Sequence, residues 1–151
     1  MIIAVDFDGT CCIHNYPEIG EENPYSIQTM KALIENGHKI FLWTMRGHAK
    51  DVIVNADDES IKSVDTQRDT LQEALDWLKE RGVDICGNIS PAQFSTSPKQ
   101  YAALYIDDAA LGCPITKFKG HTVVDWLKVA TIFKEANMIT QEQYNKIKSL
   151  K

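Results

Sequence analysis

The chain has 151 residues, of which 44% are hydrophobic and 25% are charged, so it can form one compact domain with its own core but not a second full-sized one. Its formal net charge of -5 disfavours a broad basic surface for nucleic acid, although a small phosphorylated ligand needs only a local positive centre. No apolar run approaches the roughly 18 residues that a transmembrane helix requires. The four cysteines show no C-x-x-C spacing, which favours a reduced, cytoplasmic protein.

The first half of the chain alternates between strand and helix patterns. Residues 2–7 (IIAVDF) form a short, β-branched apolar run that predicts a buried strand. A turn-rich stretch rich in Pro and Gly follows. A helix is expected from Ser26, which can cap it, to Gly37, which can end it. Residues 39–44 (KIFLWT) predict a second buried strand.

Residues 47–66 have no clear periodicity. The segment DVIV within this range fits either a strand or part of a helix, and the following NADDES is polar and acidic. The range is much longer than a strand-to-helix connection usually needs. We therefore treat it as an insert of uncertain structure, and expect it to serve as a partial lid or as a contact in a homo-oligomer.

The second half begins with a helix pattern from Leu71 to Gly82. Residues 84–89 (DICGNI) then predict a third strand, residues 90–98 a loop, and residues 102–107 (AALYID) a fourth strand.

Two further helices are expected near the end of the sequence. Apolar residues recur at helical spacing over residues 123–133, and Thr140 with Gln143 matches a capping box that would open the last helix. The alternation of strands and helices along the chain predicts a single α/β domain over residues 1–151. It would be a three-layer structure, a parallel sheet with helices on both faces.

Polar residues end three of the predicted strands. Asp6 and Asp8 end the first strand, Thr44 ends the second, and Asp107 with Asp108 ends the fourth. Ligands of open α/β sheets bind at the carboxyl ends of the strands, so these side chains are expected at one edge. A single acidic pair is more often simple turn chemistry, but two pairs on separate strands favour a site.

Crowded carboxylates need protons or a cation. Two carboxylates about 4 Å apart repel each other by about 4 kcal/mol at an effective dielectric constant near 20. Oxygen ligands of this kind suit Mg²⁺, which often binds one or two carboxylates together with a phosphate oxygen. The acidic residues therefore predict a Mg²⁺ site that handles phosphoryl groups.

The same residues resemble the motifs of the haloacid dehalogenase (HAD) superfamily. VDFDGT is similar to its first motif, D-x-D-G-T, and Thr44 in LWTMRG to its second. Lys99 is similar to the lysine of the third motif, and Asp107-Asp108 to the acidic pair of the fourth. The matches extend in the family's order to the region of Leu127. The resemblance implies a HAD-like Rossmannoid fold without a full cap domain, as in small bacterial members.

The resemblance also implies a mechanism. Asp6 would be the nucleophile, already ionised at neutral pH, and would form an aspartyl-phosphate. Asp8 would protonate the leaving oxygen and then activate water. An acid at position 8 favours a phosphatase over a dehalogenase or an ion-pumping ATPase. Thr44 and Lys99 would bind the phosphoryl oxygens, and Arg46 is a further candidate for that contact.

The implied metal ligands of Mg²⁺ are the Asp6 carboxylate, the Asp8 backbone carbonyl and Asp107, with Asp108 either a ligand or an orienting residue. The partner would be a phosphorylated substrate, small or macromolecular. Two other functions stay open: a receiver-like regulatory module that binds phosphate or Mg²⁺, and a catalytically silent interaction protein. Receiver domains place these motifs in a different order.

Overall fold

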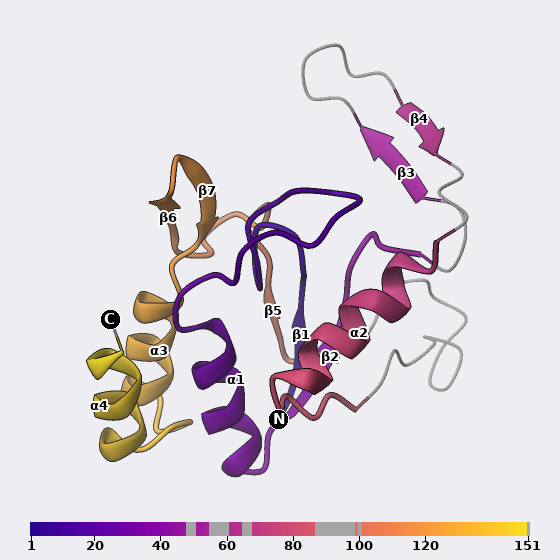
Figure 1. Ribbon diagram of the computed structural model, residues 1–151. Coiled ribbons are helices and arrows are strands. Elements are labelled where there is room, and N and C mark those ends of the chain that lie inside the picture. The colour runs from indigo at the N-terminus through magenta and orange to yellow at the C-terminus, as the bar shows by residue number, and fades with distance from the viewer. Residues whose placement is uncertain (48–50, 55–60, 65–67, 87–98, 100, 151) are drawn as a thin grey trace.

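The computed structural model describes residues 1–47, 51–54, 61–64, 68–86, 99 and 101–150. It is a mixed α/β structure in which a three-stranded parallel sheet is flanked by helices (Figure 1). The strands are β1 (Ile2–Val5), β2 (Lys39–Leu42), β3 (Asp51–Val54), β4 (Ile61–Val64), β5 (Leu104–Ile106), β6 (Ile115–Phe118) and β7 (His121–Val124). The helices are α1 (Ser26–Glu35), α2 (Thr70–Glu80), α3 (Trp126–Glu135) and α4 (Gln141–Ser149).

Strand β1 lies at the centre of the sheet, in the order β2-β1-β5. It pairs in parallel with β2, where Ile3 lies opposite Ile40, and with β5, where Val5 lies opposite Ile106. The strands occupy the positions expected from the sequence but are shorter than the predicted ranges. Because all three run in the same direction, their carboxyl ends meet at one edge, which is where the acidic residues follow.

The insert that the sequence left unassigned contains an antiparallel hairpin. Strands β3 and β4 pair with Asp51 opposite Val64 and Val54 opposite Ile61, so DVIV is a strand. In Figure 1 this hairpin projects away from the parallel sheet. The other residues of 47–66 are described only at Gly47. The role of the insert as a lid or an oligomer contact stays a prediction.

The predicted third strand, residues 84–89, is described only as far as Cys86. Residues 84–86 form no regular strand, but the Cys86 N–H donates a hydrogen bond to the Ile40 carbonyl at 2.9 Å. This bond places the segment next to β2. Residues 87–89 and the predicted loop 90–98 lie outside the described residues.

The helix predicted over residues 123–133 begins later than expected. Val123 and Val124 belong to β7, which pairs with β6 across a turn in which Lys119 and Gly120 both have positive φ. That backbone conformation matches the twist of a two-residue hairpin. The Asp125 side chain then accepts a hydrogen bond from the Lys128 N–H, which caps α3. The valines favoured the strand because branched side chains pack well there.

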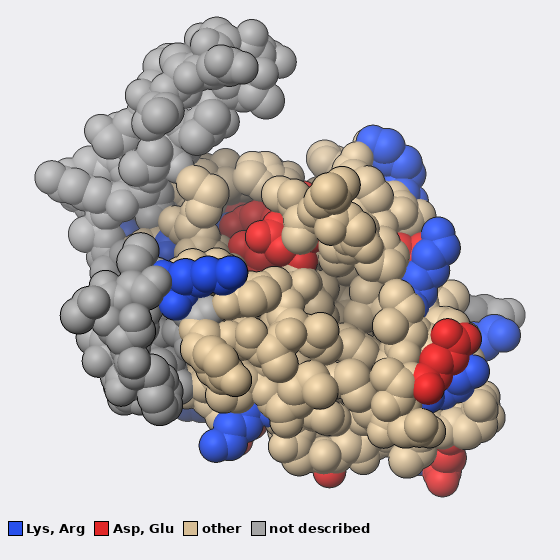
Figure 2. All heavy atoms as spheres, turned by 180° about the vertical axis from the view of Figure 1, so that it is seen from behind, with Lys and Arg blue, Asp and Glu red and all other residues tan. Residues whose placement is uncertain are grey.

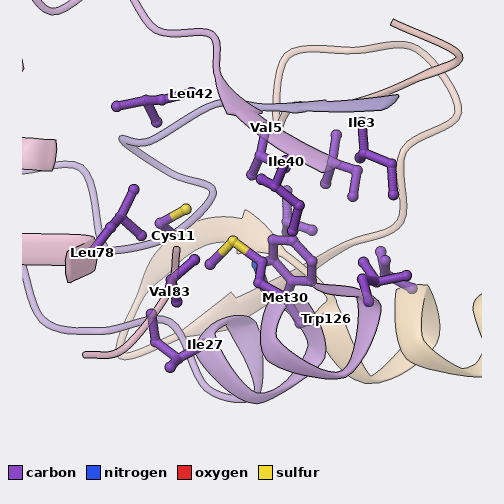
Figure 3. Close-up of a cluster of buried hydrophobic side chains, with 14 of the residues drawn as sticks. Ile3, Val5, Cys11, Ile27, Met30, Ile40, Leu42, Leu78, Val83 and Trp126 are labelled. Atoms are coloured by element: carbon purple, nitrogen blue, oxygen red, sulfur yellow. The ribbon is translucent and has the colours of Figure 1, made fainter. Parts of the chain in front are cut away.

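The main hydrophobic cluster of the described residues lies on the face of the sheet that carries Ile3 and Val5. Ala4 and Phe41 are buried on the opposite face. Figure 3 shows Met30 and Trp126 below the side chains of Ile3, Val5 and Ile40. All four helices contribute to this single buried cluster, through residues such as Ile27, Leu78, Val129 and Ile147.

The sequence had predicted helices on both faces of the sheet. In the described part of the chain, the buried residues of the helices group with the Ile3 and Val5 face, and helices on the opposite face stay a prediction. Successive right-handed crossovers that move in the same direction, from β1 to β2 and on to the segment at Cys86, place α1 and α2 on the same face.

The predicted cap of α1 is wrong, because Tyr25 and not Ser26 occupies the N-cap position, and no described side chain caps the helix. The Ser26 hydroxyl group instead donates to the Cys11 carbonyl at 3.3 Å.

The other described helices begin with side-chain caps. Asp69 caps α2 by accepting a hydrogen bond from the Gln72 N–H, and Thr140 with Gln143 forms the predicted capping box of α4. In the part of the chain that the structure describes, no helix has the length and apolar character to cross a membrane. The four cysteines form no disulfide.

Candidate functional site

The acidic residues after β1 and β5 form a compact group. Ligand oxygens of Asp6, Asp107 and Asp108 all lie within 4.8 Å of one another. Asp6 directly follows β1, and its N–H donates to the Ile106 carbonyl at 2.9 Å, so the ends of the two strands are fixed together. Figure 2 shows acidic side chains inside a hollow of the molecular surface. We refer to these three residues as the acidic triad.

The triad is under electrostatic strain when no cation is present. The pKa of Asp6 is raised from 3.8 to about 7, mainly because the group is buried. The Phe7 N–H opposes this rise, and the charges of Asp107, Asp108 and Asp8 add to it. Burial and the charge of Asp107 also raise the pKa of Asp108. The resemblance implied an Asp6 that is fully ionised at neutral pH, whereas a pKa of about 7 leaves the side chain only partly ionised there when no cation is present.

The donor set of the triad fits a hard divalent cation. Three carboxylate groups converge, and a cation among them would remove the mutual repulsion that raises the pKa of Asp6. The triad could therefore hold a metal ion, with Mg²⁺ one member of that class. The Asp8 carboxylate does not belong to this group.

Thr10, which the sequence analysis did not single out, connects the two acidic segments. Its hydroxyl group donates to Oδ2 of Asp6 at 3.3 Å and accepts from the Asp108 N–H at 3.2 Å. The side chain is fully buried. Thr10 is the last residue of the D-x-D-G-T motif, so the motif itself carried the signal for this residue.

The backbone of Thr10 is held in turn by two buried side chains. Its carbonyl oxygen accepts hydrogen bonds from Nδ2 of Asn23 and from Nε1 of Trp126, both at 2.8 Å. Asn23 also donates to the Val124 carbonyl at 2.8 Å. Neither Asn23 nor Trp126 had a signal in the sequence for this role. Trp126 had been assigned only to the apolar face of a helix.

Asp8 is paired with Arg46 rather than with the triad. Nε of Arg46 donates to Oδ2 of Asp8 at 2.7 Å, and Nη2 donates to Oδ1 at 2.8 Å. The pair is buried, with 1% of the Arg46 side chain and 12% of the Asp8 side chain exposed. This two-point contact is the strongest geometry that an arginine and a carboxylate can form.

The remaining contacts of Arg46 reach the segment 16–18. Nη1 donates to the Pro17 carbonyl at 3.2 Å and Nη2 to the Glu18 carbonyl at 2.9 Å. The guanidinium carbon also lies 5.0 Å from the ring centre of Phe7 and 5.3 Å from that of Tyr16. Protein acceptors thus take four of the five N–H groups of Arg46. The guanidinium has no two-point face left for a phosphate, so these contacts do not support Arg46 as a phosphate-binding residue.

Segment 16–18 has a second basic contact on its outer side. Arg68 donates to Glu18 through Nη1 at 2.5 Å, and to Glu73 of α2 through Nε at 2.9 Å. Both carboxylates are at least partly exposed. Arg46 therefore holds the backbone of this segment from inside, and Arg68 holds a side chain of it at the surface.

The two predicted phosphate-binding residues lie after β2 and before β5. Thr44 is half-buried, and its Oγ1 accepts a hydrogen bond from the Arg46 N–H at 3.3 Å, which leaves the hydroxyl proton directed elsewhere. Lys99 is exposed, and its Nζ lies 5.2 Å from the ring centre of Tyr105. Tyr105 is on β5, two residues before Asp107. Their binding of phosphate stays a prediction.

Comparisons with known proteins identify one relative. No family model matches the chain, and no curated protein matches it. A solved structure of a conserved protein from Bacteroides thetaiotaomicron matches with a TM-score of 0.64 and 31% sequence identity. The match covers 90% of this chain and 91% of that one. The chain therefore belongs to the same family as this conserved Bacteroides protein.

Proposed function

We propose that the protein is a phosphatase that hydrolyses a phosphate monoester with the help of Mg²⁺, as the resemblance to HAD motifs implies. The observation that supports this most directly is the convergence of Asp6, Asp107 and Asp108 at the carboxyl edge of the sheet. Hydrolysis through an aspartyl-phosphate uses a carboxylate nucleophile and a divalent cation, and the triad offers groups suited to each.

In the proposed first step, an oxygen of Asp6 attacks the phosphorus atom. A P–O bond to Asp6 forms as the P–O bond to the leaving group breaks, which gives an aspartyl-phosphate. The leaving oxygen takes a proton from Asp8, so the product is a neutral alcohol and Asp8 becomes a carboxylate. Asp8 follows Asp6 by two residues, which suits it to act on the same phosphoryl group.

In the proposed second step, water attacks the phosphorus atom of the aspartyl-phosphate. The water gives one proton to the Asp8 carboxylate, the bond from phosphorus to Asp6 breaks, and inorganic phosphate leaves. Asp6 is then a carboxylate again and Asp8 carries a proton, so the cycle closes with no net change in the protein.

Mg²⁺ and Thr44 would stabilise the negative charge of the phosphoryl group. When bound, Mg²⁺ supplies positive charge to the phosphoryl oxygens and to the carboxylates. Asp6, Asp107 and Asp108, with the Asp8 backbone carbonyl, would hold it. Thr44 would donate its hydroxyl proton to a phosphoryl oxygen, a role compatible with the acceptor contact that its Oγ1 already makes.

The deciding experiment is a phosphatase screen with Mg²⁺ across a panel of phosphate esters, run beside Asp6→Asn. We expect turnover by the wild-type protein, loss of turnover on removal of Mg²⁺ by a chelator, and recovery when Mg²⁺ is restored. Asp6→Asn keeps the size of the side chain but removes the nucleophile, so it should be inactive. Equal rates for the two proteins would mean that the activity is a contaminant.

The screen also separates an enzyme from a regulatory module. A receiver-like protein would accept at most one phosphoryl group per molecule from a reactive donor, whereas an enzyme releases phosphate steadily. A silent interaction protein would release none. Both small and macromolecular phosphate esters belong in the panel, because an uncapped HAD-like site is expected to admit large substrates.

A further inference from the structure

We propose that Arg46 is a positioning residue, which holds the Asp8 carboxylate in place for proton transfer and links its orientation to the segment 16–18. This role rests on the proposed phosphatase function. It differs from the phosphate contact that the sequence suggested for Arg46, and it assigns the Arg46 side chain one partner in the reaction, Asp8.

The first support is the geometry of the contact. Arg46 binds both oxygens of Asp8, at 2.7 and 2.8 Å, and its side chain is 1% exposed. A two-point contact fixes both the position and the plane of the carboxylate, whereas a single hydrogen bond would leave it free to rotate. Proton transfer requires this alignment, because the acid must lie within hydrogen-bond reach of the leaving oxygen.

The second support is how rigidly Arg46 itself is held. Its guanidinium contacts the rings of Phe7 and Tyr16 and donates to the carbonyls of Pro17 and Glu18. Groups at two places in the long connection between β1 and α1, residue 7 and residues 16–18, therefore determine where the guanidinium lies. A catalytic side chain is held accurately only when the residues that support it are themselves fixed.

The third support is the link to Thr44. The Arg46 N–H donates to Oγ1 of Thr44 at 3.3 Å, so the backbone of Arg46 orients the proposed phosphate-binding hydroxyl while its side chain orients Asp8. The segment Thr44–Arg46 would thus align the phosphoryl group and its proton donor together.

The contact also suits the charge that Asp8 acquires. Once the leaving oxygen has taken its proton, Asp8 is a carboxylate, and the guanidinium offers it two charge-assisted hydrogen bonds. The same carboxylate must then accept a proton from water. Arg46 would keep it aligned between the two steps.

The test compares two substrates of the wild-type protein and of Arg46→Gln: an alkyl phosphate from the active members of the panel, and p-nitrophenyl phosphate. An alkoxide leaves only with a proton, whereas p-nitrophenolate leaves as an anion. The measured quantity is kcat/KM, which covers the steps up to departure of the leaving group. We expect kcat/KM for the alkyl phosphate to fall about 100-fold or more, and that for p-nitrophenyl phosphate to fall less than about 5-fold.

The ratio of the two kcat/KM values is the decisive readout. Both are measured on the same preparation, so a smaller folded fraction cancels from the ratio. In Arg46→Gln, kcat/KM for the alkyl phosphate divided by that for p-nitrophenyl phosphate should fall. Arg46→Lys, which keeps the charge but cannot form a two-point contact, should lower this ratio less than Arg46→Gln does. Added guanidinium ion, well below denaturing concentrations, should partly restore the ratio in Arg46→Gln.

Arg68→Gln is the matched control. Arg68 contacts the same segment through Glu18 and also binds Glu73, on the surface side. Its ratio should equal that of the wild-type protein. If Arg68→Gln changed the ratio as much as Arg46→Gln, the placement of the segment and not the contact with Asp8 would matter, and the proposal would be wrong.

A double-mutant cycle supplies a further check. If Arg46 acts through Asp8, then Arg46→Gln should cost little more kcat/KM for the alkyl phosphate when Asp8 is already Asn. Additive losses would contradict the proposal. If the wild-type protein hydrolyses the esters and Arg46→Gln has the same ratio, the role of Arg46 is wrong but the phosphatase function stands. If the wild-type protein hydrolyses none of the esters, the phosphatase function and this role are both wrong.

Discussion

Gly9 lies so close to Asp108 that no larger residue fits in its place. A Cβ atom at position 9 would lie 2.4 Å from Oδ2 of Asp108 and 2.6 Å from its Cγ, and Gly9 also has a φ of +81°. The residue therefore meets two requirements at once: a backbone conformation that glycine adopts readily, and room for a carboxylate of the acidic triad.

Gly9→Ala should displace the Asp108 carboxylate and weaken metal binding. We expect the dissociation constant of Mg²⁺, measured by isothermal titration calorimetry, to rise about 10-fold or more, in the range typical of changes to groups that orient metal ligands. Gly112→Ala is the control, because Gly112 has a φ of +89° but nothing within 4 Å of its Cβ position. Both variants should lose about 1 to 2 kcal/mol of unfolding free energy from the backbone. Unchanged Mg²⁺ affinity in Gly9→Ala would contradict the assigned site.

Thr10→Val should lower kcat/KM even in the molecules that stay folded. Valine has nearly the same shape, but it lacks the hydroxyl group that contacts Asp6 and the Asp108 N–H. We expect kcat/KM to fall about 10- to 100-fold, as for other residues that orient metal ligands. Thr10→Ser, which keeps the hydroxyl group, should retain most of the activity.

The matched control for Thr10→Val is Thr29→Val in α1. Thr29 is also fully buried, and its Oγ1 has no hydrogen-bond partner among the described residues. Its replacement should leave both activity and the free energy of unfolding nearly unchanged or slightly improved, because an unsatisfied hydroxyl group is removed. Equal losses in the two variants would show that Thr10 acts only through packing.

Asn23→Ala should destabilise the protein by about 2 to 3 kcal/mol, since it removes two buried hydrogen bonds and leaves the Val124 carbonyl without this donor. Urea unfolding monitored by tryptophan fluorescence measures this change. Asn145→Ala is the control: Asn145 is exposed on α4, and its replacement should alter the unfolding free energy by less than about 0.5 kcal/mol. A loss below that limit in Asn23→Ala would be evidence that Asn23 does not anchor the site.

The acidic triad should make stability depend on pH when no metal is present. The pKa of Asp6 is 3.8 in the unfolded chain and about 7 in the folded one, so the folded state holds the proton more tightly. The stability that this proton confers is fully present below pH 3.8 and is lost as the pH rises through about 7. Thermal unfolding across this window should show the decline, and Asp6→Asn, which does not titrate, should show a smaller one.

The stabilisation that Mg²⁺ gives should change with pH in the opposite direction, increasing as the pH rises. A cation in the triad favours the ionised form of Asp6, so binding releases a proton and strengthens as the pH rises. The increase in Tm on addition of Mg²⁺ should therefore be larger at pH 8 than at pH 6. An increase that does not vary with pH would mean that the ion binds away from Asp6.

The sequence predicted most of the sheet because the signals for its strands are local. Short apolar runs predicted β1, β2 and β5, and the capping box of Thr140 and Gln143 marked where α4 begins. Ser26 is the first residue of α1 but does not cap it. Local signals failed where a strand and a helix compete for the same apolar residues. Val123 and Val124 fit either pattern, and pairing with β6 decided in favour of the strand.

The acidic site was also largely visible in the sequence. Asp6, Asp107 and Asp108 follow separate strands, and parallel strands bring their carboxyl ends to one edge, so their convergence followed from topology. The packing of the four described helices against the Ile3 and Val5 face did not follow, because it depends on the direction of each crossover, which the strand order sets.

The sequence by itself determined which groups could do chemistry, because residue type and position at a strand end are local properties. Only the tertiary structure decided how those groups are paired. Arg46 and Asp8 are far apart in the chain but form an ion pair. Asn23 and Trp126 are also far apart in the chain but donate to the same carbonyl group, that of Thr10. Such contacts depend on how loops pack over the sheet, and no short stretch of sequence encodes that packing.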